Sequence, residues 1–294
     1  MSLETVLATC QKLNAQVEML AAIGAEMRIR KDGLAPDPDV RALIQNVVSA
    51  ADPQLLDGIE PAQEAMALAF ITSFFRQAQD LLDNPARPKG WTYTDPLILN
   101  SIGQLSRVVV RAIGTLAQKR PSLAANLAAP GAFLDVGTGT AWLAIEAAKL
   151  WPALKVVGID PFETALALAR QNVAATGMES RVELRQMGVE DVGENEQFSL
   201  IFYPSPFIPK EVSAAAVPRL AKALKPGGTL VFGLFLPAPT PQGEALLYLR
   251  LVRGGGHAWG RDEASGMLGA AGLQEVEVFD SGTPALLVVG KKAG

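Results

Sequence analysis

The sequence predicts an α/β protein in which an all-α N-terminal domain precedes a seven-stranded, mostly parallel sheet with a C-terminal antiparallel hairpin. Apolar residues recur at three- and four-residue steps over the first 120 residues, which is the spacing of a helix face. Beyond residue 130, short apolar runs alternate with helical stretches, a pattern typical of parallel strands joined by crossover helices. We therefore expect a helical domain over residues 1–120 and an α/β domain over residues 121–294.

The N-terminal domain is expected to contain four helices. An apolar stripe runs over residues 3–21, and a shorter one covers residues 40–47. Pro61 stands where a third helix begins, because proline is favoured in the first helical turn. Turn-forming residues predict a loop over 83–96, and a fourth helix is expected over about 96–118.

The C-terminal domain is expected to contain seven strands. Five are predicted as parallel strands, at residues 133–136, 155–160, 181–187, 198–203 and 229–235. Helices are predicted between them at 140–151, 162–176 and 210–224. The last two strands, 274–280 and 284–292, are joined by the short turn Ser-Gly-Thr. A connection that short makes a hairpin, so the last strand must run antiparallel to its neighbour.

Composition excludes several classes of protein. The hydrophobic fraction is 49% and the charged fraction 19%, so a sizeable core is expected. The net charge of −4 argues against a nucleic-acid partner, which usually needs a basic surface. Neither a signal peptide nor a membrane-spanning stretch is expected. The single cysteine, Cys10, excludes an internal disulfide and a cysteine-based metal cluster, so we expect no metal and a reducing, cytoplasmic compartment.

A glycine turn, residues 137–141, follows the first predicted strand in the stretch "FLDVGTGTAW". Gly137 and Gly139 allow the backbone to turn tightly and to approach a ligand closely. The second predicted strand ends at Asp160, where a carboxylate can accept hydrogen bonds from the ribose hydroxyls of an adenosine. Both a nicotinamide dinucleotide and S-adenosylmethionine (SAM) contain such an adenosine, so the rest of the chain has to distinguish them.

The spacing favours SAM. The third glycine of a dinucleotide pattern would fall on Trp142, whose indole would prevent close packing of helix and strand. The observed spacing is acid-x-Gly-x-Gly-x-small, made by Asp135, Gly137, Gly139 and Ala141. The stretch "LKPGGTLVFG" places a Pro-Gly-Gly turn before the fifth strand, and the closing hairpin is not the ending of a dinucleotide fold.

The order and spacing of "LDVGTGTAWLAIEAAKLWPALKVVGID", "QMGVEDV", "YPSPF" and "LKPGGTLVFG" resemble the class I SAM-dependent methyltransferase family. The resemblance covers about residues 130–292 and implies a Rossmann-like fold, SAM as cofactor and S-adenosylhomocysteine (SAH) as product. It implies that the glycine turn holds the methionine end of SAM and that Asp160 holds the ribose. The cofactor-binding residues then expected are Asp135, Gly137, Thr138, Gly139, Asp160, Pro161, Phe162, Gly188, Val189 and Tyr203.

The chain departs from the family pattern after the third strand. Members often carry an acid there that binds the adenine amino group, whereas this chain has Gly188. Either the backbone at Gly188 and Val189 contacts the adenine, or Glu190 or Asp191 replaces the missing acid.

Acceptor-site candidates follow from chemistry and position. Methyl transfer mainly needs the acceptor held in line with the methyl group, and a base is needed only if the acceptor must lose a proton. The segment "YPSPFIP" resembles the Asn-Pro-Pro-Tyr type loop of amine methyltransferases, but Ser205 lacks the amide that holds a planar nitrogen. The expected catalytic residues are His257, Tyr203 and Ser205, and the expected substrate-lining residues are Trp91, Tyr93, Phe207 and Trp259.

The leading functional hypothesis is methylation of an oxygen or nitrogen of a small molecule, such as a secondary metabolite. The alternatives are a non-catalytic SAM-binding protein and an NAD(P)-dependent oxidoreductase. The apolar stripes of the N-terminal helices are either an intramolecular core or the interface of a homodimer. No nucleic-acid or membrane partner is expected.

Overall fold

A computed structural model describes residues 2–235, 239–280, 282 and 285–294. The chain divides into two compact units, Met1–Asp83 and Asn84–Gly294. The predicted Ser-Gly-Thr turn at 281–283 lies mostly outside the described residues. Within the described part of the chain, no helix is both long and apolar enough to cross a membrane.

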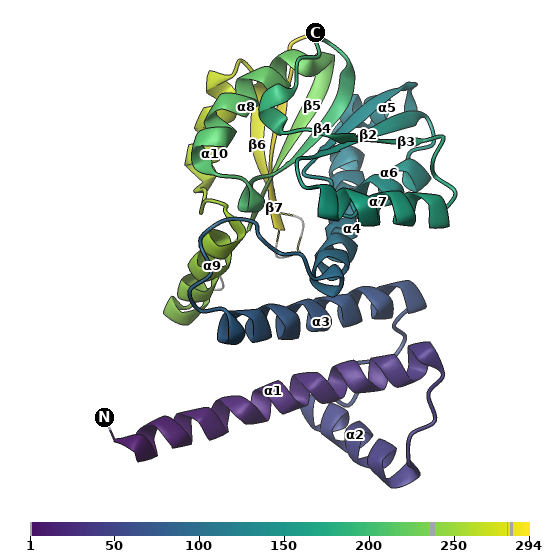
Figure 1. Cartoon of the computed structure of the whole chain (residues 1–294). Helices are drawn as coiled ribbons and strands as arrows, with labels where there is room; N and C mark the ends of the chain where they lie inside the picture. The colour runs from purple at the N-terminus through teal and green to yellow at the C-terminus, as the bar shows by residue number, and fades with distance from the viewer. Residues whose placement is uncertain (1, 236–238, 281, 283–284) are drawn as a thin grey trace. The chain divides into compact units, whose positions relative to one another are not determined.

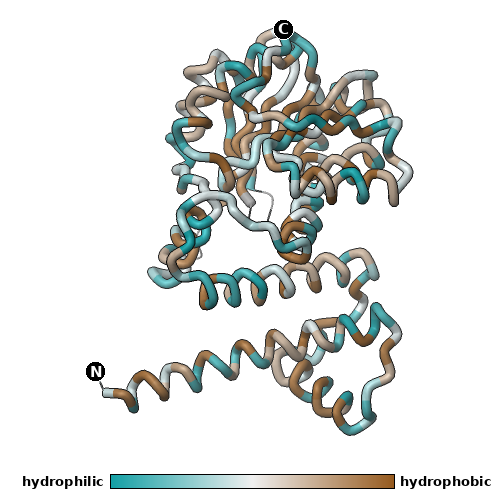
Figure 2. The backbone as a smooth tube through the Cα atoms, in the orientation of Figure 1, coloured by the Kyte–Doolittle hydropathy of each residue, from teal (hydrophilic) through white to brown (hydrophobic). Residues whose placement is uncertain are grey.

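The first unit is a group of three helices, α1 (Leu3–Asp32), α2 (Pro38–Ala51) and α3 (Pro61–Asp83), as predicted (Figure 1). Its small core contains Met27 of α1, Val48 of α2 and Ile71 of α3. The N-terminal part of α1 does not join this core, because every residue from 2 to 19 is exposed. Hydrophobic and hydrophilic residues alternate along that part of the helix (Figure 2).

The second unit begins with two helices, α4 (Pro96–Lys119) and α5 (Pro121–Ala128). The side chain of Asp95 caps α4 by accepting a hydrogen bond from the Leu97 N–H at 2.7 Å. Val110 and Ile113 of α4 are fully buried in the core that covers one face of the sheet. By its contacts α4 therefore belongs to the α/β unit, and the division between the two compact units lies between Asp83 and Asn84.

The sheet contains the seven predicted strands, in the order β3-β2-β1-β4-β5-β7-β6. Their bounds are β1 Gly131–Val136, β2 Leu154–Asp160, β3 Val182–Gln186, β4 Phe198–Pro204, β5 Leu224–Phe235, β6 Gln274–Asp280 and β7 Ala285–Lys291. The first five strands pair in parallel, whereas β7 runs antiparallel to both β5 and β6, as predicted. The strand order reverses between β1 and β4, and ligands of open α/β sheets bind at such a point.

Helices cover both faces of the sheet (Figure 1). The remaining helices are α6 Trp142–Leu150, α7 Glu163–Ala175, α8 Lys210–Ala223, α9 Pro241–Gly254 and α10 Arg261–Ala270, with short 3₁₀ helices at Val189–Asp191 and Ser205–Phe207. One buried cluster unites α4, α5, α6 and α7 with the sheet, and a second unites α8 and α10 with it. Hydrophobic residues concentrate along the strands between these layers (Figure 2), so the sheet is a rigid base for the loops at its carboxyl edge.

Candidate functional site

The glycine turn connects β1 to α6 at the point where the strand order reverses. Gly137 (φ 62°), Gly139 (φ 55°) and Ala141 (φ 64°) all have left-handed backbone conformations. Glycine adopts this conformation freely, but an alanine loses about 1–2 kcal/mol by it. The Ala141 N–H donates to the Thr138 carbonyl at 2.8 Å, and the Thr138 N–H donates to the Ile159 carbonyl of β2 at 3.0 Å. The turn is therefore a defined, hydrogen-bonded structure that holds one strained residue.

Asp160, at the end of β2, connects the turn to the next loop. One carboxylate oxygen accepts the Gly139 N–H at 2.9 Å, and the other accepts the Phe162 N–H at 2.9 Å. Burial raises the pKa of this carboxyl, while the two backbone hydrogen bonds act in the opposite direction. Each oxygen keeps a second lone pair, so the carboxylate can still accept a ribose hydroxyl.

Asp135 lies beneath the turn, with only 1% of its surface exposed. It accepts a hydrogen bond from the Thr138 hydroxyl at 2.7 Å. Desolvation raises its pKa to about 7, opposed by the Thr138 hydrogen bond and reinforced by the nearby Asp160. Gly158 makes room for Thr138, because a Cβ there would lie 2.7 Å from the threonine hydroxyl oxygen. Asp135 and Thr138 therefore shape the turn from within.

The surroundings of the turn fit an adenosine-containing ligand. A Cβ on Gly139 would meet no atom closer than the Gly137 carbonyl oxygen at 3.9 Å, so the outer side of this residue is open. Pro161 and Phe162 are exposed beside Asp160, and the Phe162 ring, 45% exposed, offers an apolar face to a base. These features suit the SAM that the sequence predicts.

The segment after β3 presents both groups that the sequence left as alternatives. Gly188 and Val189 are buried, whereas Glu190 and Asp191 are exposed. The Glu190 carboxylate lies over Gly188, where a Cβ would come within 2.6 Å of it. Gly188 therefore gives the Glu190 carboxylate the room that a side chain at this position would occupy.

Tyr203 and Ser205 do not face an acceptor, which differs from the sequence prediction. Tyr203 is fully buried, stacks on Phe232 and donates its hydroxyl proton to the Ser213 hydroxyl at 2.8 Å. Burial raises the pKa of this phenol. The buried Ser205 hydroxyl donates to the Gly233 carbonyl at 2.7 Å. Both hydroxyls have partners inside the protein because β4 and the turn after it are covered on both sides.

Three predicted acceptor segments meet beside the carboxyl end of β4. The Trp91 ring contacts Tyr93 and Phe207 at centroid distances of 5.3 and 5.4 Å. A Cβ on Gly256 would lie 1.9 Å from the Pro206 carbonyl oxygen, so the loop before His257 packs directly on the turn after β4. Residues from segments far apart in the sequence thus line one aromatic region.

His257 and Trp259 have different surroundings. The His257 side chain is 33% exposed, and its Nε2 lies 3.5 Å from the Glu263 carboxylate. Trp259 is only 8% exposed, and its ring packs edge-on against Phe232 in the core and against His257, at centroid distances of 5.6 and 4.9 Å. Glu263 was not predicted, and it also bonds Lys210, which lowers its pKa. Only its position in the first turn of a helix after His257 could have indicated it.

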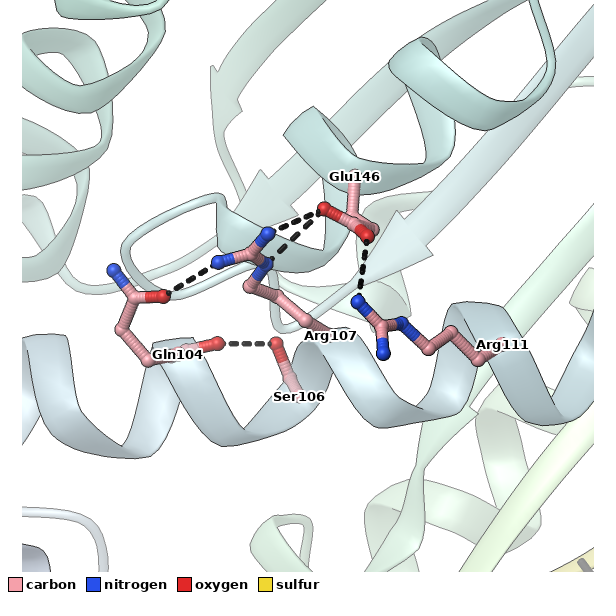
Figure 3. Close-up of polar contacts among 6 residues, drawn as sticks. Gln104, Ser106, Arg107, Arg111 and Glu146 are labelled. Atoms are coloured by element: carbon pink, nitrogen blue, oxygen red, sulfur yellow. Dashed lines mark hydrogen bonds and ion pairs between the residues drawn. The ribbon is translucent and has the colours of Figure 1, made fainter. Parts of the chain in front are cut away.

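Sequence reasoning also missed α4 as a support of the site. Arg107 donates two hydrogen bonds to Glu146 of α6, at 3.1 and 2.8 Å, and Arg111 lies 3.9 Å from the same carboxylate. These side chains point from α4 toward α6 (Figure 3). These contacts attach α4 to α6, the helix that directly follows the glycine turn.

Comparisons with known proteins show that this chain is similar to methyltransferases. A family model described as a methyltransferase domain matches residues 133–228. The chain is 35% identical over 167 residues to the release factor glutamine methyltransferase of Cereibacter sphaeroides, covering 53% of this chain and 57% of that protein. The corresponding enzyme of Rhodopirellula baltica is 33% identical over 101 residues, with 34% of each chain covered. The chain thus spans about a third to just over half the length of these curated relatives.

Two solved structures share the fold over nearly their whole length. An O-methyltransferase family protein from Burkholderia thailandensis has a TM-score of 0.66 at 14% identity, covering 100% of this chain and 99% of that one. Human N-acetylserotonin methyltransferase in complex with SAM has a TM-score of 0.65 at 15% identity, with the same coverage. Residues 133–228, from β1 to the start of β5, therefore match a methyltransferase domain, and the whole chain shares the fold of these two methyltransferases.

Proposed function

We propose that this protein transfers a methyl group from SAM to a hydroxyl oxygen of a small, partly aromatic molecule. SAM supplies a methyl group that its sulfonium already activates, so the protein mainly has to hold both partners in line. The observation that carries the proposal is the hydrogen-bonded glycine turn with Asp160 at the switch point, next to the aromatic region of Trp91, Tyr93 and Phe207.

The cofactor side is assigned to the turn and its neighbours. Gly137 and Gly139 expose backbone near the methionine end, and Asp160 accepts the ribose hydroxyls. Phe162 covers one face of the adenine, and Glu190 accepts its amino group in place of the missing family acid. An exposed carboxylate beside a buried glycine supports this choice over contact with the backbone alone.

We assign to His257 the role of the base that removes the proton of the acceptor hydroxyl. Its Nε2 lies toward Glu263, which favours the tautomer that carries the proton on Nε2 and leaves Nδ1 as an acceptor. In this role Nδ1 takes the proton of the acceptor hydroxyl, and Glu263 stabilises the imidazolium that forms. Glu263 would then be a positioning residue that acts through His257.

An oxygen acceptor is favoured over a planar nitrogen. The segment "YPSPFIP" resembles the Asn-Pro-Pro-Tyr type loop of amine methyltransferases, but Ser205 lacks the amide that holds a planar nitrogen there. The Ser205 hydroxyl is already used by the Gly233 carbonyl, so no free amide-like partner is available there. The aromatic lining supports an apolar small molecule rather than a polar peptide.

The first test is a calorimetric titration with SAM, SAH, NAD and NADP. We expect the two sulfur ligands to bind in about the micromolar range, without the dinucleotides. Asp160→Ala should weaken SAH binding by at least about tenfold, since a charged hydrogen-bond acceptor is lost. Binding of a dinucleotide alone would contradict the proposal, and SAM binding without turnover of any phenol or peptide acceptor would indicate a non-catalytic protein.

The second test concerns the base. Once a hydroxyl acceptor is found, His257→Ala should lower kcat by about 100-fold or more, because the base that removes the acceptor proton is lost. Glu263→Gln should lose less, because the amide can still accept a hydrogen bond. Wild-type rates and an unchanged pH profile for His257→Ala, or turnover of a glutamine peptide and of no hydroxyl compound, would contradict the assignment.

We also propose a homodimer through α1, in a reducing cytoplasmic compartment. Leu3, Val6, Leu7, Leu13 and Val17 are between 46% and 72% exposed, and an isolated helical segment of this kind is marginal in water. A second copy would cover these residues. Light scattering after gel filtration should give a dimer for the wild type and a monomer for Leu7→Glu; a monomeric wild type would exclude the dimer.

A further inference from the structure

We propose that Asn172 of α7 and Asn100 of α4 are positioning residues that set the glycine turn for the methionine end of SAM. The inference rests on the proposed function, because it assigns the turn to that end of the cofactor. The two asparagines lie 72 positions apart in the sequence and meet at the turn.

The contacts form a chain from α4 to the turn. The Asn172 amide nitrogen donates to the Thr140 carbonyl at 3.0 Å and to the Asn100 side-chain oxygen at 3.0 Å. The same Asn100 oxygen accepts the Trp142 indole N–H at 3.4 Å. Asn100 thus holds Asn172, and Asn172 holds the turn.

The Thr140 carbonyl is the point at which such a bond controls the turn. It belongs to the peptide that precedes Ala141, the non-glycine residue with a φ of 64°. Rotation of that peptide would relieve the strain at Ala141 and change the course of the backbone after Gly139. The hydrogen bond from Asn172 fixes the orientation of this peptide.

A second contact from α4 closes the other side of Thr140. Thr140 is 1% exposed, and a Cβ on Gly103 would lie 2.0 Å from its hydroxyl oxygen. The helix is itself held to α6 by the Arg107–Glu146 pair (Figure 3). The turn is therefore enclosed between its own strand and a helix that precedes the α/β sheet in the sequence.

The decisive experiment compares two ligands on the full chain. SAH carries the amino-acid end, whereas 5′-methylthioadenosine has the same adenosine without it. Asn172→Asp replaces the donor by an acceptor of the same shape, facing the Thr140 carbonyl. By calorimetry it should weaken SAH binding by about tenfold and leave 5′-methylthioadenosine within about twofold of the wild type.

Three further variants make the result specific. Asn100→Asp keeps the acceptor for Asn172 and is the conservative variant, expected to retain most of the SAH affinity. Asn100→Ala removes that acceptor and should weaken SAH alone, with no further loss when combined with Asn172→Asp, because both act on one contact. Asn126→Ala, which removes a hydrogen bond to the Gly227 carbonyl at the opposite edge of the sheet, is the matched control.

Each outcome of these titrations tests the positioning role of Asn172 and Asn100. Equal SAH affinity in Asn172→Asp and the wild type overturns the inference, as does an equal loss of both ligands, which would mean a general structural role. If Asn172→Asp does not fold, the Asn100→Ala comparison answers the same question. A wild type that binds neither ligand would instead contradict the proposed function, and the inference with it.

Discussion

At the scale of single residues, the glycine turn is supported by two buried acids, Asp160 and Asp135. Asp160 spends one lone pair of each oxygen on the backbone, and Asp135 is enclosed with Thr138. A buried carboxyl is stable as the neutral acid unless hydrogen bonds or charges compensate, so burial raises both pKa values. The architecture of the turn is therefore linked to pH.

The first prediction concerns this linkage at Asp135. Its folded-state pKa of about 7 lies above the ordinary value of 3.8, so the folded protein holds this proton more tightly than the unfolded chain. The stabilising contribution is full below about pH 4 and is lost as the pH rises to about 7, by up to about 4 kcal/mol. Urea unfolding should therefore show the wild type losing stability relative to Asp135→Asn between about pH 4 and pH 7.

The control is Asp262→Asn, at an exposed position in the first turn of α10. Its free energy of unfolding should follow that of the wild type across the same pH range. A constant difference between the wild type and Asp135→Asn would mean that Asp135 is ionised in the folded protein at all of these pH values.

At the scale of elements, α4 has two roles, and residues at different positions along the helix perform them. Its buried face, including Val110 and Ile113, fills the core above the sheet. Its first turns carry Asn100 and Gly103 to the glycine turn. Two glycines of this helix have different surroundings. Gly103 lies against Thr140, whereas Gly114 has room for a side chain.

The second prediction compares these two glycines. A methyl group at Gly103 would lie 2.0 Å from the Thr140 hydroxyl oxygen, so Gly103→Ala should lower the free energy of unfolding by about 1–3 kcal/mol. At Gly114 the nearest atom is a Leu150 methyl at 3.9 Å, so Gly114→Ala should raise it by roughly 0.5–1 kcal/mol through helix propensity. Denaturant unfolding measures both; equal effects of the same sign would contradict the close approach at Gly103.

At the scale of the whole molecule, the chain consists of two compact units whose division does not follow the change from helical to α/β sequence. The three helices before Asp83 have their own small core, whereas α4 and α5 complete the core of the sheet. The functional division predicted at residue 120 would cut between α4 and the face that it covers.

The third prediction tests this division with fragments. Residues 84–294 should form a soluble protein that binds SAH, because all of the candidate cofactor residues and α4 are present. Residues 129–294 should aggregate, since removal of α4 exposes the apolar face that Val110, Ile113 and Leu116 cover. Gel filtration and calorimetry give the answer, and a monodisperse 129–294 fragment with full SAH affinity would show that α4 is dispensable.

The sequence by itself determined the order of the seven strands, most of the helices, the closing hairpin, and the glycine turn with Asp160, whereas α5 and α10 were not predicted. These features follow from local patterns: the helical period, short apolar runs and turn residues act over a few neighbours in the chain. The seven strands and the antiparallel β7 were predicted for this reason.

Only the tertiary structure decided which polar side chains are free. The residue types at positions 203, 205 and 259 suit an acceptor site, but all three side chains are buried. Tyr203 bonds to α8, Ser205 bonds to β5, and Trp259 packs against Phe232 in the core. No sequence pattern indicated three further residues. Glu263 contacts His257, Asn100 accepts a hydrogen bond from Trp142, and Asn172 donates one to Thr140. Burial and hydrogen-bond partners depend on segments distant along the chain, and no local pattern encodes them.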